Sequence, residues 1–226
     1  MTSYHPGLII LAIFSLGVAG GVIGLTLRAS LSRLQYRIIG PRDDERDLPH
    51  PGPRWWLPPI LGLAWFALAV AYGHTGWPWL FLWLPFATAG MWLTAVDLDV
   101  KRLPDKVLGW VALHSLVVGL VLILMGYATW LPALVGALGA GGLFWLLHLM
   151  SRGGLGFGDV KYVTICGWNL GLLGWEPIFW GLLVACFCAI IWAIATRRWQ
   201  FAFGPWLSLG TVTAASLAGF AQAGAF

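Results

Sequence analysis

Apolar stretches of roughly helix length alternate with short polar or glycine- and proline-containing connections along almost the whole chain. A helix needs about 20 residues to cross the roughly 30 Å of hydrocarbon in a bilayer. The pattern therefore predicts an all-α, polytopic membrane protein with about eight transmembrane helices. The predicted spans are 7–27, 57–73, 78–96, 107–126, 129–149, 159–173, 176–195 and 204–222.

Composition and charge placement support this prediction. Only 10% of the residues are charged and 59% are apolar, whereas soluble domains carry about 25% charged residues. If the spans alternate, all 13 Lys and Arg residues fall in or beside four connections: 28–56, 97–106, 150–158 and 196–203. Because positive charge marks the cytoplasmic face, we predict that both termini are extracytoplasmic. The net charge of +4 is explained by these connections and does not indicate a nucleic-acid partner.

The longest polar stretch is 28–56, which follows the first apolar run. It is too short to build a hydrophobic core of its own, so we expect a cytoplasmic loop with an interfacial helix near 28–39. No Lys or Arg precedes Arg28, so the first run lacks the basic start of a signal peptide and should be retained. We therefore divide the chain into 1–56, the first transmembrane helix and its loop, and 57–226, the transmembrane core.

The loop contains an acidic cluster. Its charges either attract a basic substrate or belong to an ordinary solvated segment. The cluster consists of Asp43, Asp44, Glu45 and Asp47.

Two aspartates carry most of the functional information. Asp97 follows the third apolar run, and Asp159 closes the glycine-rich segment 153–159 just before another apolar run. A carboxylate beside hydrocarbon is costly, so membrane proteins rarely keep one without a use for it. The predicted topology brings both to the cytoplasmic edge, where water is available. Two facing carboxylates can share a proton and activate water for peptide cleavage.

The neighbouring residues suggest how such a pair would work. Gly156 and Gly158 allow the backbone to adopt φ > 0 and to approach an extended substrate strand closely. Asp159 lies at the first turn of its predicted helix, where the ionised form is favoured, and Asp97 at the last turn, where it is disfavoured. We therefore predict that Asp159 is the usual anion and Asp97 the usual acid. The three cysteines lack zinc-ligand spacing, so we expect no metal and no cofactor.

Three segments carry a family resemblance: 97-DLDVKRLPDKV-107, 156-GFGDVKY-162 and 203-FGPWLSLG-210. In this order they resemble the signatures of the type IV prepilin leader peptidases, which are intramembrane aspartyl proteases of the Gly-x-Gly-Asp group. The resemblance covers roughly residues 80–215. It implies that Asp97 and Asp159 are catalytic, and that the substrates are prepilin-like precursors with short basic leaders in the bacterial inner membrane.

The sequence departs from that family at one place. Many larger members carry a cytoplasmic insert with paired cysteines near the amino terminus, associated with methylation of the new amino terminus. The segment 28–56 contains no cysteine. We therefore expect the zinc-organised insert to be absent, which argues against methyltransferase activity.

Five other polar residues have weaker claims to the site. Asp99 is a reserve candidate, because two residues beyond Asp97 it would point elsewhere on a helix. Asp105 is predicted to cap the next helix, and Lys161 either orients Asp159 or a substrate carbonyl, or extends to the membrane surface. His114 and His148 are interpreted as hydrogen-bonded packing residues.

Other functions are consistent with the same pair of carboxylates. A small proton-coupled transporter would use them as a relay, and an inactive pilus or secretion scaffold would keep the fold alone. A presenilin-like protease would cut within the bilayer. We favour leader removal, with prepilin-like precursors and the lipid bilayer as the partners.

Overall fold

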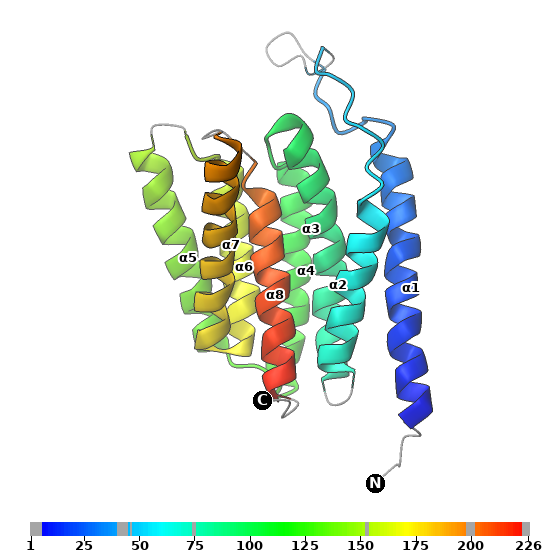
Figure 1. Ribbon diagram of the computed structural model, residues 1–226. Helices are drawn as coiled ribbons and strands as arrows, with labels where there is room; N and C mark the ends of the chain where they lie inside the picture. The colour runs from blue at the N-terminus through cyan, green and yellow to red at the C-terminus, as the bar shows by residue number, and fades with distance from the viewer. Residues whose placement is uncertain are drawn as a thin grey trace.

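The computed structural model describes residues 6–39, 45, 47–73, 76–151, 154–197 and 202–222 (Figure 1). Within these residues the chain forms eight α-helices and one short 3-10 helix, η1 (Trp77–Trp79). The α-helices are α1 (Pro6–Leu31), α2 (Leu57–Tyr72), α3 (Leu80–Val100), α4 (Asp105–Leu124), α5 (Trp130–Met150), α6 (Phe157–Leu173), α7 (Trp175–Thr196) and α8 (Gly204–Gln222).

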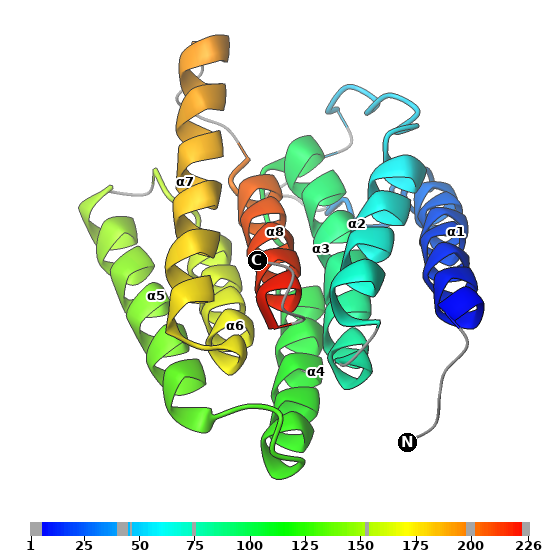
Figure 2. The same ribbon diagram turned by 60° about the horizontal axis from the view of Figure 1, so that its bottom comes forward.

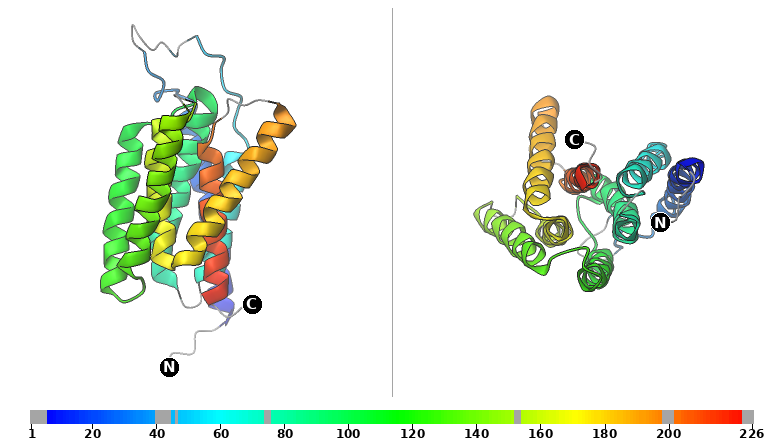
Figure 3. Two further views of the ribbon diagram at one scale, coloured as in Figure 1. Left: turned by 90° about the vertical axis from the view of Figure 1, so that its left-hand side faces the viewer. Right: turned by 90° about the horizontal axis from the view of Figure 1, so that it is seen from below.

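Each predicted span corresponds to one helix, so the all-α prediction is confirmed. Five segments are long and apolar enough to cross a membrane: those containing α1, α3, α4, α5 and α7. The other three helices, α2, α6 and α8, lie among them in the bundle (Figure 3). Much of the surface of α6 and α8 is buried against protein, which allows a more polar sequence there.

One local prediction was wrong. Residues 28–39 are all described, and they form no separate interfacial helix, because α1 continues to Leu31 and 32–39 form turns. Leu34 has a φ of 54°, in the left-handed region that ends a right-handed helix. The turns direct Tyr36 and Arg37 toward the end of α3, where both bind Asp99.

The helices are arranged around α8, which lies near the centre and packs against α2, α3, α6 and α7 (Figure 3). Helix α1 lies on one rim against α2, and α5 lies on the opposite rim against α6. Although α4 and α5 are consecutive in sequence, they stand apart on different sides of α6 (Figure 2). This arrangement places α3, α4, α6 and α8 around a common interior.

Both described ends of the chain, Pro6 and Gln222, lie at the same end of the bundle (Figure 1). The opposite end carries the connections that follow α1, α3, α5 and α7, and we call it the basic end. The described basic residues in these connections or in the adjoining helix ends are Arg28, Arg33, Arg37, Arg54, Lys101, Arg102, Lys106, Lys161 and Arg197.

Glycine contacts hold the helices close together. A Cβ on Gly167 of α6 would collide with the carbonyl oxygen of Gly136 on α5, and one on Gly210 of α8 would collide with that of Gly181 on α7. Small residues of this kind let the backbones of membrane helices come into direct contact. In lipid the hydrophobic effect does not hold helices together, so the dispersion attraction of such close contacts stabilises the packing instead. The positions of α6 and α8 are therefore fixed by close packing.

Candidate active site

The two aspartates singled out by the sequence come from different helices at the same end of the bundle. Asp97 lies in the last turn of α3, which ends where Lys101 adopts a left-handed φ of 51°. Asp159 lies in the first turn of α6. Helices α3 and α6 both pack against α8, and the two aspartates lie at the same, basic end of the bundle, as the sequence predicts.

Asp97 is held by the third motif of the sequence. Its side chain is buried, and its Oδ2 accepts a hydrogen bond of 2.8 Å from the backbone N–H of Gly204, the first residue of α8. A Cβ at position 204 would lie 2.9 Å from the same oxygen, so only glycine fits there without displacement. Sequence reasoning did not assign this role to Gly204. The Gly204–Pro205 pair could have indicated this role, because proline favours the first turn of a helix and the preceding glycine then lies at the helix start.

The glycines before Asp159 act differently from the prediction. Gly156 has a φ of −67° and Gly158 lies within α6, so neither uses the positive φ that glycine allows. A Cβ on Gly156 would come within 3.2 Å of Asp159 Oδ2, and one on Gly158 within 3.0 Å of the Cβ of Leu103. In this structure Gly158 thus provides space for another segment of the same chain.

Leu103 lies next to the starts of both α6 and α8. It lies in the connection between α3 and α4, is buried, and contacts Gly158 with its Cβ. Its Cδ2 lies 3.2 Å from the position that a Cβ on Gly204 would take. Leu103 is therefore next to the segments that hold both carboxylates.

Asp105 and Lys161 pair with each other. Lys161 Nζ lies 2.7 Å from Asp105 Oδ1, and both side chains are partly or largely exposed. Asp105 is the first residue of α4 and the capping position before it, Pro104, makes no side-chain cap, so the predicted capping role is wrong. The carboxylate of Asp105 instead accepts a hydrogen bond from the ammonium group of Lys161. Lys161 therefore binds Asp105 and not Asp159 in this structure.

Asp99 faces away from Asp97. Two residues along a helix correspond to a rotation of about 200°, and Asp99 accordingly binds Tyr36 and Arg37 on the far side of α3. The expectation that it points elsewhere agrees with this geometry. Glu45 of the loop's acidic cluster pairs with Arg102 at 2.7 Å, Asp47 is exposed, and Asp43 and Asp44 lie outside the described residues.

The two histidines bind backbone carbonyl groups. His114 Nε2 lies 3.1 Å from the oxygen of Phe81, and His148 Nδ1 lies 2.6 Å from the oxygen of Leu155. Both contacts join a helix to a neighbouring segment, as the packing interpretation predicts. Among the described residues, no three His, Cys, Asp or Glu side chains gather closely enough to hold a metal ion.

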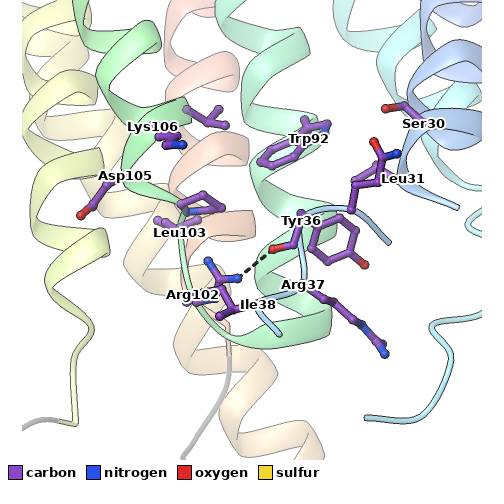
Figure 4. Close-up of a pocket in the computed structure, with 13 residues that line it drawn as sticks. Ser30, Leu31, Tyr36, Arg37, Ile38, Trp92, Arg102, Leu103, Asp105 and Lys106 are labelled. Carbon is purple, nitrogen blue, oxygen red and sulfur yellow. Dashed lines mark hydrogen bonds between the residues drawn. The ribbon is translucent and has the colours of Figure 1, made fainter. Parts of the chain in front are cut away.

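A cavity of about 780 Å³ lies beside the site, between the end of α1, the turns after it, α3 and the start of α4 (Figure 4). Leu103 belongs to its wall and also lies next to Gly158 and Gly204. Arg102 crosses the cavity edge and donates a hydrogen bond of 2.8 Å to the carbonyl oxygen of Tyr36 (Figure 4). The labelled lining residues include Trp92, Lys106 and Ile38.

Comparison with known proteins agrees with the geometry. Residues 84–194, which include both aspartates, match the profile of the Type IV leader peptidase family. This chain belongs to that family. It is similar to the "Prepilin leader peptidase/N-methyltransferase" of Pectobacterium carotovorum subsp. carotovorum, with 30% identity over 141 residues. The match covers 57% of this chain and 48% of that relative, so it spans about half of the relative's length.

No solved structure matches the chain. The type IV leader peptidase family and the apolar helices together make this a multi-pass membrane protein. The site described above lies at the basic end of its helices.

Proposed function

We propose that this protein is a membrane-embedded aspartyl endopeptidase that removes short basic leader peptides from type IV prepilin-like precursors. The proposal is supported by the placement of Asp97 in the last turn of α3 and of Asp159 in the first turn of α6, both at the basic end of a leader peptidase family member. Leu103 lies next to Gly204, which binds Asp97, and next to Gly158, which precedes Asp159, so the segments that carry the two carboxyl groups are neighbours. The proposed place of cleavage is the cytoplasmic edge of the bacterial inner membrane.

The chemistry follows from the proximity of two carboxyl groups. Two close carboxylates do not both ionise cheaply, so the pair retains one proton. The ionised partner removes a proton from water as the water attacks the substrate carbonyl, and the protonated partner donates to the carbonyl oxygen. As the C–N bond breaks, the departing amine takes the proton that the first partner removed from water, and a hydroxyl of the tetrahedral diol returns its proton to the second partner, so that the pair regains its starting state.

The donor at Gly204 bears on which aspartate is ionised. A backbone N–H favours the ionised form of the carboxylate that accepts it, and the start of α8 adds the positive end of a helix. Both effects act on Asp97. They offset the end of α3, which disfavours the ionised form of Asp97, whereas Asp159 keeps its favourable position in the first turn of α6. The assignment of Asp159 as the usual anion and Asp97 as the usual acid stays a prediction, and we propose that the two carboxyl groups titrate as a unit that holds one proton.

The basic end sets the proposed orientation. Positive charge is retained on the cytoplasmic side of bacterial membranes, so we place the basic end, and with it the carboxylate pair, in the cytoplasm. Both termini are then extracytoplasmic. A precursor would keep its apolar helix in the bilayer, while its basic leader reaches the pair from the cytoplasm.

We also propose that the protein cleaves without methylating. The relative from Pectobacterium carries both activities in its name, but the segment 28–56 of this chain contains no cysteine. An assay that follows both leader removal and methyl transfer to the new amino terminus tests this. Methylated product from the purified protein alone would contradict it.

The direct test is cleavage of a synthetic precursor, with a basic leader before an apolar helix, by the purified protein in liposomes. We expect the wild type to release the leader, and Asp97→Ala and Asp159→Ala to release none above background. Asp47→Ala is the matched control, since Asp47 is an exposed aspartate of the basic end. Cleavage by both site variants at the wild-type rate, with folding verified, would overturn the proposal.

A further inference from the structure

A second carboxylate at the basic end lies in a buried cluster of charges that the proposed reaction does not use. Asp99 follows Asp97 by two residues, and its side chain is only 4% exposed. We propose that Asp99 is a positioning residue that fixes the last turn of α3 and so holds Asp97 against Gly204. This inference rests on the proposed function.

Arg37 joins Asp99 to the loop. Its guanidinium group is 6% exposed and donates to both carboxylate oxygens, with Nη2 at 2.8 Å from Oδ1 and Nε at 3.0 Å from Oδ2. This is the bidentate geometry in which an Arg–carboxylate pair is strongest and most directional. The remaining donors reach the carbonyl oxygens of Leu48 and Pro49, both at 2.9 Å. Arg37 therefore links the returning part of the loop to α3.

Arg54 closes the cluster from the other side. It is buried, and its Nη2 donates to the Tyr36 hydroxyl at 2.6 Å and lies 3.7 Å from Asp99 Oδ2. The Tyr36 hydroxyl in turn donates to Asp99. Arg54 Nη1 donates to the carbonyl oxygen of Leu31, the last residue of α1. Asp99 is thus the common partner of Tyr36 and Arg37, from the turns that follow α1, and of Arg54, from the last part of the loop.

Such a cluster is a costly way to gain stability. Buried charges lose their hydration, and an apolar core of the same volume is often as stable. What a fully bonded cluster provides is one defined arrangement of the segments that it joins. Here those segments are the loop and the last turn of a helix that ends three residues after Asp97. Helix ends fray readily, so a catalytic group at this position needs an external support.

The geometry of the helix gives the two aspartates complementary positions. Asp97 and Asp99 are about 200° apart around α3, so one faces α8 and the other faces the loop. Rotation or unwinding of this turn would break both the bond to Gly204 and the cluster around Asp99. Asp99 therefore acts on the reaction through the position of Asp97.

The loop holds the connection after α3 as well. Arg102 Nε lies 2.7 Å from Glu45 Oε1, and Arg102 Nη2 binds the carbonyl oxygen of Tyr36 (Figure 4). The next residue is Leu103, which lies next to Gly158 and Gly204. The loop thus supports both the turn that carries Asp97 and the connection that follows it.

The test combines kinetics with hydrogen exchange on the full-length protein in nanodiscs. Asp99→Asn keeps the shape of the side chain and removes its charge. We expect kcat to fall roughly 10²-fold, as for a small misplacement of a reacting group, while KM stays within about twofold. Amide exchange should become faster in 32–39, in 47–54 and in Asp97–Val100. Asp47→Asn, the same change at an exposed position of the loop, should leave all of these at wild-type values.

If Asp99→Asn does not fold, two further variants test the cluster. Tyr36→Phe removes one hydroxyl and should lower kcat several-fold with faster exchange in the last turn of α3. Arg37→Lys keeps the positive charge but loses the bidentate hydrogen bonds of the guanidinium group, so its kcat should lie between those of Asp99→Asn and the wild type.

Wild-type kcat and exchange in Asp99→Asn, or in Tyr36→Phe if that variant alone folds, would overturn the inference. So would complete loss of cleavage with unchanged exchange, because Asp99 would then be a reacting group. If the wild type does not cleave the precursor, the proposed function fails, and the exchange data still decide whether Asp99 holds the turn.

Discussion

The interior of the bundle and its basic end are held together in different ways. In the interior, glycines such as Gly136 and Gly167 bring helix backbones into direct contact. At the basic end, charged side chains such as Arg37 and Asp99 join segments that have little apolar surface to bury. The comparison shows a division of tasks: close packing fixes where the helices stand, and directional polar bonds fix how their ends, including Asp97, are oriented.

Gly204 is the residue where the two kinds of contact meet. It is packed as closely as the interior glycines, but the atom that it contacts is a carboxylate oxygen of Asp97. We expect Gly204→Ala to lower kcat roughly 10²-fold by displacing that carboxylate, with little loss of helical structure by circular dichroism. The control is Gly109→Ala on α4, where a Cβ meets no atom within 4 Å. Equal kcat values for the two variants would remove Gly204 from the site.

The interior contacts are tested by a pair of glycines on neighbouring helices. Gly167→Ala places a Cβ against the carbonyl of Gly136, and overpacking of this kind costs about 1–3 kcal/mol. Gly139→Ala on α5 meets no atom within 4 Å and should cost nothing. Thermal unfolding in detergent measures both. If Gly167→Ala is as stable as Gly139→Ala, close glycine packing does not fix the position of α6.

Much of this organisation can be predicted from the sequence. Hydropathy locates all eight helices, and the placement of basic residues predicts that Asp97 and Asp159 lie at the same end of the bundle. Hydropathy does not determine how each helix is rotated or which neighbours it meets. The bond from Gly204, the pairing of Asp105 with Lys161, and the packing of Leu103 next to Gly158 depend on those rotations. The role of Asp99 was not predictable either, because its partners lie far away in the sequence.

The basic end should respond to pH, whereas the glycine contacts should not. The hydrogen bond from Arg102 holds the pKa of Glu45 below its ordinary value of 4.5. The stability that this pair provides is therefore fully present above about pH 4.5 and is lost as the pH falls through the lower pKa of the folded state. For this pair, whose Arg102 and Glu45 side chains are 29% and 14% exposed, we expect about 0.5–1 kcal/mol.

Denaturation of the wild type and Glu45→Gln at pH 7 and at pH 3 measures this contribution. The two proteins should differ at pH 7 and converge at pH 3. A difference that persists at pH 3 would show that the effect of Glu45 does not come from its charge.

The central claim is that Asp97 and Asp159 share one proton, and infrared spectroscopy of the protonated carboxyl group tests it most directly. We predict one titrating carboxyl band in the wild-type protein that changes in both Asp97→Asn and Asp159→Asn, because each residue sets the titration of the other. Asp47→Asn should leave the band as it is. Separate bands for Asp97 and Asp159, each unaffected by replacement of the other residue, would contradict the account.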